Sequence, residues 1–291
     1  MVKLSVVIIT YNEEKNIARC LESVKDLADE IVVVDSFSVD RTQEICSEYG
    51  AKVLKHHFTG HIEQKNWAFS HASFHHILSI DADEEVSDKL RRSIAKSKQN
   101  WNHDGYYFNR MNNYCGKWIK HGGWYPDQKL RLVDRRKGRW TGINPHDRFE
   151  LVPVSKKQKL AGNLLHYSYA SIPEHLKQIN RYTEIIATGY FHEGIRSNLL
   201  KIIFNPTWKF FRNYFLRLGF LDGFHGIVLY ANVAFETFLK YIKLWQITNQ
   251  YKKGLLDLNS LKKKREYLIE NISYLILSLT SVMSNLLCRK P

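Results

Sequence analysis

The first hundred residues alternate short apolar runs with stretches of helical periodicity, and this alternation restricts the fold more than any other feature. Residues 3–10, 30–35 and 52–54 are rich in β-branched side chains, which are typical of buried strands. Residues 13–24 and 39–49 space their apolar side chains as a helix does. Because parallel strands need a crossover connection, usually a helix, the pattern predicts an α/β fold: a mostly parallel sheet with helices on both faces.

A fourth apolar run, residues 77–80, ends in the acidic tripeptide Asp81-Ala82-Asp83. At the end of a parallel strand, this tripeptide would lie at the edge where open α/β sheets bind ligands, and carboxylates are ligands of hard cations. One carboxylate could hold a metal while the other holds a sugar hydroxyl. The simpler alternative is an acidic turn that caps a helix beginning near Ser87.

Polar residues also follow the first two predicted strands. Residues 10–14 read Thr-Tyr-Asn-Glu-Glu, and Asp35 ends the second apolar run. Since the carboxyl ends of parallel strands meet at one edge of a sheet, we expect both to share a crevice with the Asp81-Ala82-Asp83 tripeptide. Three polar segments at one edge of the sheet favour a ligand site over a helix cap.

The pattern changes beyond residue 100. Short runs rich in Trp, Tyr, Asn and Gly predict a few mixed strands and long loops up to residue 170. From Ser171 onward the periodicity is helical, with Pro173 near the start of one helix and Pro206 interrupting another. The sequence therefore predicts a helical region over residues 171–250 and a helical tail over residues 251–291.

The chain is strongly basic. It carries 43 Lys and Arg residues against 29 Asp and Glu residues, a formal net charge of +14. Such a protein favours polyanionic partners, which include nucleic acid, anionic lipid and phosphorylated ligands. The sequence contains no zinc finger, basic zipper or RNA-binding signature, so nucleic acid is not an expected partner.

Residues 199–245 mix aromatic residues and Leu with Lys and Arg, a composition typical of helices in a membrane interface. The alternative is a helical pack that closes the domain. Residues 272–283 are apolar but too few for the roughly 20 residues that span a bilayer. The basic run 262–265 could meet anionic lipid or stay solvated. Scattered cysteines and the lack of a signal peptide at residues 1–10 complete the prediction: a cytoplasmic protein, peripheral on the inner face of the cytoplasmic membrane.

Three motifs together resemble the nucleotide-binding half of the family 2 glycosyltransferases. They are residues 5–14 (SVVIITYNEE), residues 33–36 (VVDS) with residues 40–42 (DRT), and residues 80–83 (IDAD). The resemblance implies the Rossmann-like GT-A fold, an inverting reaction, a UDP-sugar donor and a divalent cation, Mn²⁺ or Mg²⁺. Residues 64–68 (QKNWA), 123–127 (GWYPD) and 130–132 (LRL) are similar to the bacterial lipopolysaccharide core β-1,4-glucosyltransferase group.

The resemblance also implies roles for individual residues on the donor side. Thr10, Tyr11 and Glu13 would contact uracil and ribose, and Asp35 would accept a hydrogen bond from the base. Lys65 would act on the same nucleotide, and Asp81 would lie near the ribose. Asp83 and His166 would bind the metal, and Arg131 would stabilise the diphosphate. Structural alternatives stay open for several of them. Tyr11 could simply pack, Asp35 could cap a helix, Glu13 could serve a helix amino terminus, Arg131 could pair with a structural carboxylate, and His166 could be a core histidine.

An inverting transfer also needs a base beside the acceptor hydroxyl. Asp127 is the first candidate, because it lies in an aromatic-rich loop where partial desolvation would raise its basicity. Trp124 could stack on a sugar face, and Gln128 is expected on the acceptor side. Asp147, where the subgroup usually has Glu, is the second candidate for the base. Leu132 replaces the Trp of the Gln-x-x-Arg-Trp motif of processive members, which argues against polymer synthesis.

Charge and resemblance together predict a metal-dependent transferase that moves a hexose, with glucose as first choice, from a UDP-sugar to a lipopolysaccharide-core or other lipid-linked glycan acceptor. Residues 1–170 would form the glycosyltransferase domain, with residues 1–100 binding the nucleotide-sugar and residues 101–170 facing the acceptor. One alternative acceptor is a polyprenyl-linked capsule or O-antigen glycan. Another possibility is a non-catalytic nucleotide-binding or glycan-binding protein of the same fold.

Overall fold

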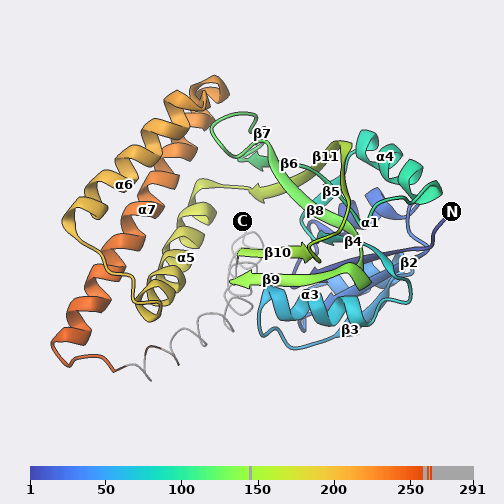
Figure 1. Ribbon diagram of the computed structural model, residues 1–291, viewed down its shortest axis with the longest axis horizontal. Helices are drawn as coiled ribbons and strands as arrows, with labels where there is room; N and C mark the ends of the chain where they lie inside the picture. The colour runs from blue at the N-terminus through green and yellow to red at the C-terminus, as the bar shows by residue number, and fades with distance from the viewer. Residues whose placement is uncertain (144–145, 258–260, 262, 264–291) are drawn as a thin grey trace, which may run out of the picture. The chain divides into compact units, whose positions relative to one another are not determined.

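The computed structural model describes residues 1–143, 146–257, 261 and 263, and the chain forms two compact units (Figure 1). The first unit comprises Met1–Arg110 and Gln128–His166, and the second comprises Met111–Asp127 and the described residues of Tyr167–Asn271. The predicted domain boundaries at residues 170 and 250 stay predictions. The apolar run 272–283 and most of the basic run 262–265 lie outside the described residues.

The strands and helices follow the alternation that the first hundred residues predicted. The strands are β1 (Leu4–Thr10), β2 (Glu30–Asp35), β3 (Lys52–Lys55), β4 (His76–Asp81), β5 (Glu84–Val86), β6 (Gly105–Tyr114), β7 (Lys117–Trp118), β8 (Asp127–Asp134), β9 (Gly138–Ile143), β10 (His146–Leu151) and β11 (Lys157–Tyr169). The helices of the first unit are α1 (Ile17–Val24), α2 (Thr42–Glu48), α3 (His61–Ser70), α4 (Asp88–Gln99) and the short η1 (Arg135–Lys137).

Nine strands of the described chain form one sheet, in the order β3-β2-β1-β4-β8-β6-β11-β5, with β7 paired to β6. Strands β3, β2, β1 and β4 are parallel, whereas β8 runs antiparallel to β4 and β5 antiparallel to β11. Strands β9 and β10 form a separate antiparallel hairpin. The parallel half of the sheet is the part that carries the predicted strand-helix alternation.

Side chains of the central strands enter two hydrophobic clusters on opposite faces of the sheet, because successive strand residues point to opposite sides. Leu4, Val6 and Ile8 of β1 pack with buried residues of α1, α2 and α4. Val7 of β1 and Val32 of β2 pack instead with α3 and with the hairpin of β9 and β10. Helices therefore cover both faces, as the sequence predicted.

The first helix begins later than its periodicity predicts, at Ile17 and not at residue 13. Glu13 donates its backbone N–H to Thr42 Oγ1 at 2.8 Å, and Asn16 donates its backbone N–H to the Glu13 carbonyl at 2.9 Å. The segment after β1 is thus a turn, held by a hydrogen bond to the first residue of α2. Local periodicity contains no sign of that long-range hydrogen bond.

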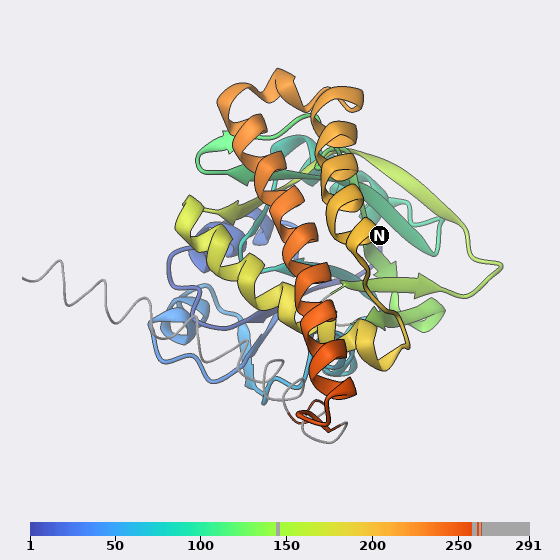
Figure 2. The ribbon, with the colours of Figure 1, turned by 90° about the vertical axis from the view of Figure 1, so that its left-hand side faces the viewer.

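The second unit is largely helical. Its helices are α5 (Ile172–His192), α6 (Leu199–Phe211), η2 (Arg212–Leu216), η3 (Gly219–Asp222) and α7 (Gly223–Lys252). Helix α7 lies between α5 and α6 in Figure 2 and contacts both. Gly122, in the loop segment of this unit, has φ of +72°, and a Cβ atom there would lie 1.9 Å from Tyr230 Cζ of α7. The close approach requires a residue without a side chain.

Pro206 lies inside α6 and does not interrupt it, contrary to the prediction from the sequence. Proline removes one backbone donor and usually kinks or breaks a helix. Here Asn198 Oδ1 accepts a hydrogen bond from the Lys201 backbone N–H at 2.9 Å, which caps the helix start, and α6 packs along α7. Capping and packing offset the lost backbone bond.

No single helix in the described part of the chain combines the length and the apolar character needed to cross a bilayer. The segments Leu199–Leu216 and Gly219–Lys252, bent by 73° at their break, meet that criterion of length and composition only when taken as a pair.

Candidate functional site

Three polar loops of the first unit lie at the same edge of the sheet. Strand β1 pairs with β2 on one side and β4 on the other, so Thr10 lies opposite Asp35 and Ile9 lies opposite Asp81. The carboxyl ends of these parallel strands thus share one edge. The structure brings together Thr10, Asp35 and Asp81, as the sequence predicted.

Hydrogen bonds join the loop after β1 to the loop after β2. Asn12 donates its backbone N–H to Ser38 Oγ at 2.8 Å, and the Val39 N–H returns a bond to Asn12 Oδ1 at 2.9 Å. Asn12 and Phe37 have φ values of 52° and 64°, in the left-handed region that costs non-glycine residues energy. Two strained residues in bonded loops fit a surface shaped for a ligand.

Asp35 is fully buried within this loop pair. Its Oδ1 accepts hydrogen bonds from the Ser38 N–H at 2.8 Å and from Gln43 Nε2 at 2.7 Å, and its Oδ2 accepts from Ser38 Oγ. Burial raises the pKa of Asp35 above its ordinary value, and the Ser38 bonds only partly oppose this. The carboxylate orders its own loop, while its predicted contact with the donor base stays a prediction.

The side chains of Tyr11 and Glu13 are half-buried beside Thr10, which is buried. Glu13 Oε2 accepts a hydrogen bond from Asn16 Nδ2 at 2.7 Å, so this carboxylate helps to form the turn that precedes α1. Their predicted contacts with uracil and ribose remain predictions.

Asp81 is held between two buried cations. Lys65 Nζ lies 3.0 Å from Asp81 Oδ1, and Arg131 Nη2 donates to Asp81 Oδ2 at 2.9 Å. Burial opposes ionisation, but Arg131 and Lys65 outweigh it and hold the pKa of Asp81 well below its usual range. Arg131 therefore pairs with the carboxylate of Asp81. Its predicted contact with the diphosphate stays a prediction.

Lys65 also bridges to Asp147 of β10, with Nζ 2.8 Å from Asp147 Oδ2. Both cations lie against the Trp140 ring, Lys65 Nζ at 4.6 Å and the Arg131 guanidinium at 5.1 Å from its centroid. Burial raises the pKa of Asp147, but the charges of Lys65 and Arg131 lower it overall. A carboxylate stabilised in this way is a weak proton acceptor at neutral pH.

Asp83 contacts His166, with Nε2 of His166 3.1 Å from Asp83 Oδ2. The antiparallel pairing of β5 with β11 sets His166 opposite Glu84 and so explains this contact. Burial raises the pKa of Asp83, but His166 more than compensates and lowers it.

The helix α4 is capped by Ser87 Oγ, which accepts a hydrogen bond from the Leu90 N–H at 3.4 Å. The acidic tripeptide is therefore not the helix cap.

The predicted acceptor residues divide between the units. Trp124 and Asp127 belong to the second unit, whereas Gln128 belongs to the first and is exposed. The Trp124 carbonyl accepts a hydrogen bond from Asn112 Nδ2 at 3.1 Å, and its half-buried ring packs near Tyr169. Asp127 is half-buried at the first position of β8.

Comparison with known proteins places the chain in a family. The model named "Glycosyl transferase family 2" matches residues 5–152, which contain the three polar loops. The chain belongs to glycosyl transferase family 2. It is a glycosyltransferase, and the resemblance of its motifs to that family is confirmed.

Several known proteins are similar to this chain over most of its length. An uncharacterized glycosyltransferase of Rickettsia typhi is 31% identical over 91% of this chain and 98% of that protein. The lipopolysaccharide core biosynthesis glycosyltransferase LpsC of Rhizobium meliloti is 28% identical over 84% of this chain and 92% of that protein. The crystal structure of S. aureus TarS 1–349 in complex with UDP-GlcNAc superposes with a TM-score of 0.44 and 16% identity, covering 87% and 92% of the two chains.

Glu84 is a residue of this family 2 site that the sequence analysis missed. Its side chain is fully buried, and Oε2 accepts a hydrogen bond from the Asp81 backbone N–H at 2.9 Å. Its Oε1 lies 3.3 Å from Arg110 Nη1 and 3.9 Å from Arg131 Nη2. Glu84 thus positions the turn between Asp81 and Asp83. The available signal was a carboxylate three residues after Asp81, the spacing of a local side-chain-to-backbone bond.

Replacement of Glu84 by alanine is expected to lower the free energy of unfolding by about 3–5 kcal/mol, because it removes a fully buried carboxylate that pairs with Arg110 and accepts the Asp81 backbone N–H. Urea denaturation measures the change. Glu85→Ala is the matched control, since that neighbour meets Arg19 at 3.7 Å with both side chains partly exposed, and about 1 kcal/mol or less is expected. Equal losses in the two variants would contradict a special role for Glu84.

Proposed function

We propose that this enzyme transfers a hexose, with glucose as first choice, from a UDP-sugar to a lipopolysaccharide-core or other lipid-linked glycan acceptor, with inversion at the anomeric carbon. The observation that carries the proposal is the shared sheet edge, where Thr10 and Asp35 end β1 and β2 and where Asp83, which contacts His166, follows the end of β4 by two residues. This edge combines a metal-binding type of donor pair with loops of the kind that hold a nucleotide.

Asp83 and His166 are the residues that would hold Mn²⁺ or Mg²⁺. They offer a carboxylate oxygen and an imidazole nitrogen 3.1 Å apart, while no group of three His, Cys, Asp or Glu side chains in the described chain is arranged to bind a metal. Two protein ligands fit an ion that takes its remaining ligands from substrate phosphates and water. When bound, the ion supplies Lewis-acid stabilisation of the departing diphosphate.

The remaining first-unit residues divide the donor between them. Thr10, Tyr11, Glu13 and Asp35 bind the uridine, with Asp81 near the ribose. Lys65 and Arg131 contribute positive charge toward the diphosphate while they keep Asp81 ionised, because each contacts that carboxylate. Fixed cations near the leaving group stabilise charge that develops in the transition state.

Asp127 is the proposed general base, and Trp124 and Gln128 contact the acceptor. The ion pair of Asp147 with Lys65 supports this choice over the second candidate, because it makes Asp147 a poor proton acceptor. Asp127 removes the proton from the acceptor hydroxyl as the new glycosidic bond forms.

The proposed acceptor class and location rest on charge and exposed apolar surface. The net charge of +14 suits a phosphorylated glycolipid in an anionic leaflet, and α6 exposes several large apolar side chains. The name of the Rhizobium relative, a lipopolysaccharide core biosynthesis glycosyltransferase, agrees with that acceptor class. We place the enzyme peripherally on the inner face of the cytoplasmic membrane.

Binding and hydrolysis of a panel of UDP-sugars and GDP-sugars test this proposal. One UDP-sugar is expected to bind in calorimetry only with Mn²⁺ or Mg²⁺, and release of UDP is expected to rise on addition of a lipopolysaccharide-core acceptor. Addition of EDTA to the same protein is the control. Preference for a GDP-sugar, or donor binding that is unchanged by EDTA, would contradict the donor and metal assignments.

A further inference from the structure

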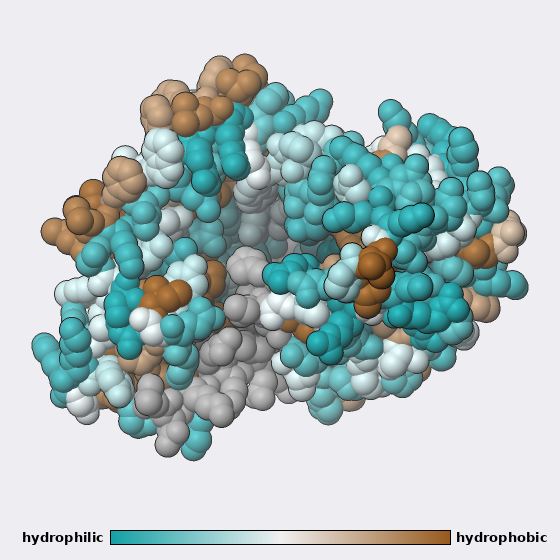
Figure 3. All heavy atoms as spheres, in the orientation of Figure 1, coloured by the Kyte–Doolittle hydropathy of each residue, from teal (hydrophilic) through white to brown (hydrophobic). Residues whose placement is uncertain are grey.

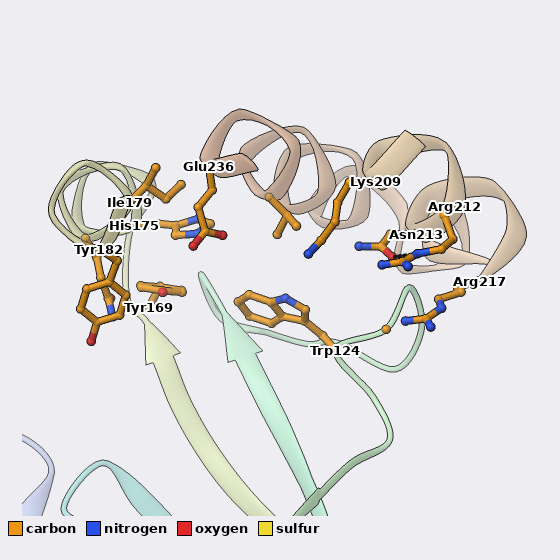
Figure 4. A pocket seen from close by; sticks show the side chains of 13 residues that line it. Trp124, Tyr169, His175, Ile179, Tyr182, Lys209, Arg212, Asn213, Arg217 and Glu236 are labelled. Atoms are coloured by element: carbon orange, nitrogen blue, oxygen red, sulfur yellow. Dashed lines mark hydrogen bonds between the residues drawn. The ribbon is translucent and has the colours of Figure 1, made fainter. Parts of the chain in front are cut away.

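A pocket of about 250 Å³ lies wholly within the second unit, between α5, α6, α7, the end of β11 and the loop before β8 (Figure 4). Typical small-molecule pockets measure about 300–1,000 Å³, so this one suits a head group and not an entire glycan. None of the donor-binding residues described above lines this pocket. Trp124, the predicted acceptor residue, forms part of its wall.

The charge of the pocket is strongly positive. Lys209, Arg212 and Arg217 line it, against one lining carboxylate, Glu236. Figure 4 shows Lys209 and Glu236 pointing into the pocket above the Trp124 ring. Burial lowers the pKa of Lys209; Glu236 opposes this shift, while Arg212 and Arg217 add to it. Gathering like charges in a partly buried space is unfavourable unless an anion compensates them.

The backbone is shaped to admit these cations. Gly123 has φ of +98°, and a Cβ atom there would lie 2.6 Å from Arg217 Nη1. Trp124 and Tyr169 add aromatic surface, with ring centroids 6.1 Å apart and planes inclined by 37°. Guanidinium groups bind phosphate oxygens through paired N–H donors, and aromatic rings provide a flat apolar surface.

An exposed aromatic stripe runs along α6 and into η2. Phe204, Trp208, Phe211 and Phe215 recur at helical spacing, each 44–64% exposed, and successive ring centroids lie 6.4, 6.0 and 5.3 Å apart. Figure 3 shows hydrophobic side chains gathered over α6 and the turn toward α7. Lys209 and Arg212 follow Trp208 and Phe211 directly in sequence, so these two pocket cations lie about 100° around the helix from the stripe.

We propose that this pocket binds the phosphomonoester group of an amphiphilic acceptor whose lipid lies against the aromatic stripe. Three cations and one carboxylate leave two net positive charges, which match the −1.5 to −2 that a phosphomonoester carries at about pH 7. The adjoining stripe distinguishes a lipid-borne phosphate from a soluble one. This inference rests on the proposed function, because it specifies the acceptor of that same transferase.

Vesicle binding tests the proposal. Phosphatidylcholine vesicles containing phosphatidic acid, a phosphomonoester, are compared with vesicles containing phosphatidylglycerol, a phosphodiester, at matched surface potential. The full chain is expected to bind the first about tenfold more tightly, and Lys209→Gln/Arg212→Gln is expected to reduce this ratio to about one. Lys201→Gln removes an exposed charge from the same helix outside the pocket and is expected to leave the ratio unchanged.

Several outcomes would overturn the proposal. A ratio near one in the unaltered protein would mean general attraction to anionic surfaces. Calorimetric binding of inorganic phosphate that needs Lys209 and Arg212, without a preference for phosphatidic acid, would mean a site for soluble phosphate.

If the double variant fails to fold, Arg217→Gln, a substitution at an exposed residue, is used to measure the same ratio of vesicle binding. UDP-sugar binding is measured in parallel: its absence in the unaltered protein would refute the proposed function, whereas the vesicle ratio reports on the pocket alone.

Discussion

Asp83→Ala is expected to abolish the metal dependence of UDP-sugar binding and to lower turnover by roughly 10²–10³-fold. The carboxylate is the proposed oxygen ligand of the cation, and the diphosphate would then leave without Lewis-acid stabilisation, which is worth several kcal/mol. Calorimetric titration of the donor with and without Mn²⁺ measures binding, and UDP release measures turnover. Loss of the 3.1 Å contact would also leave His166 without its carboxylate partner Asp83.

Asp88→Ala is the matched control for this experiment. It removes the same kind of side chain a short distance further along the chain, where the carboxylate is 77% exposed and pairs with Arg91 at 2.8 Å. Donor binding and turnover are expected to stay within about twofold of the unaltered enzyme, because exposed ion pairs contribute little. If Asp83→Ala retains metal-dependent donor binding, the carboxylate is structural and the assigned metal site is wrong.

Asp127→Asn is expected to bind the UDP-sugar with unchanged affinity and to lose roughly 10²–10⁴-fold in turnover. Asparagine keeps the shape of the side chain but cannot accept the proton of the acceptor hydroxyl, and general base catalysis contributes about that factor. Because Asp127 belongs to the second unit and the donor residues to the first, binding and chemistry are expected to separate cleanly. Donor titration and steady-state UDP release with saturating acceptor measure the two effects.

Asp147→Asn discriminates between the two candidate bases. Asp147 contacts Lys65 at 2.8 Å, so its loss is expected to disturb donor affinity more than turnover at saturating donor. The opposite pattern, with turnover lost in Asp147→Asn and retained in Asp127→Asn, would reverse the assignment. The anomeric configuration of the product, read by nuclear magnetic resonance, checks that transfer occurs with inversion.

The order of elements in the first unit followed from the sequence, because apolar periodicity is a local property that records which faces are buried. The alternation of β-branched runs with helical spacing predicted β1, β2, β3 and β4 and helices on both faces. Placement of Thr10, Asp35 and Asp81 at one edge also followed, since parallel strands in right-handed crossovers must present their carboxyl ends together.

The partners of these residues were decided only by the tertiary structure. Lys65 lies 82 residues from Asp147 in the chain, and Asp83 lies 83 residues from His166, yet each pair is in contact. Such contacts depend on strand register and on which side chains burial forces to compensate one another's charge. Neither the strand register nor the choice of charge partner leaves a periodic pattern in the local sequence. The same holds for the cationic pocket, whose lining comes from four separated segments of the second unit.

The family, the parallel core and the position of the acidic tripeptide at the end of β4 could be predicted from short motifs and periodicity alone. The tertiary structure decided that Glu84 supports the tripeptide, that Arg131 and Lys65 neutralise Asp81, and that α1 starts at Ile17. The physical reason is that desolvation makes each buried charge depend on whichever opposite charge the packed backbone brings within a few ångströms, and only the folded chain specifies that neighbour.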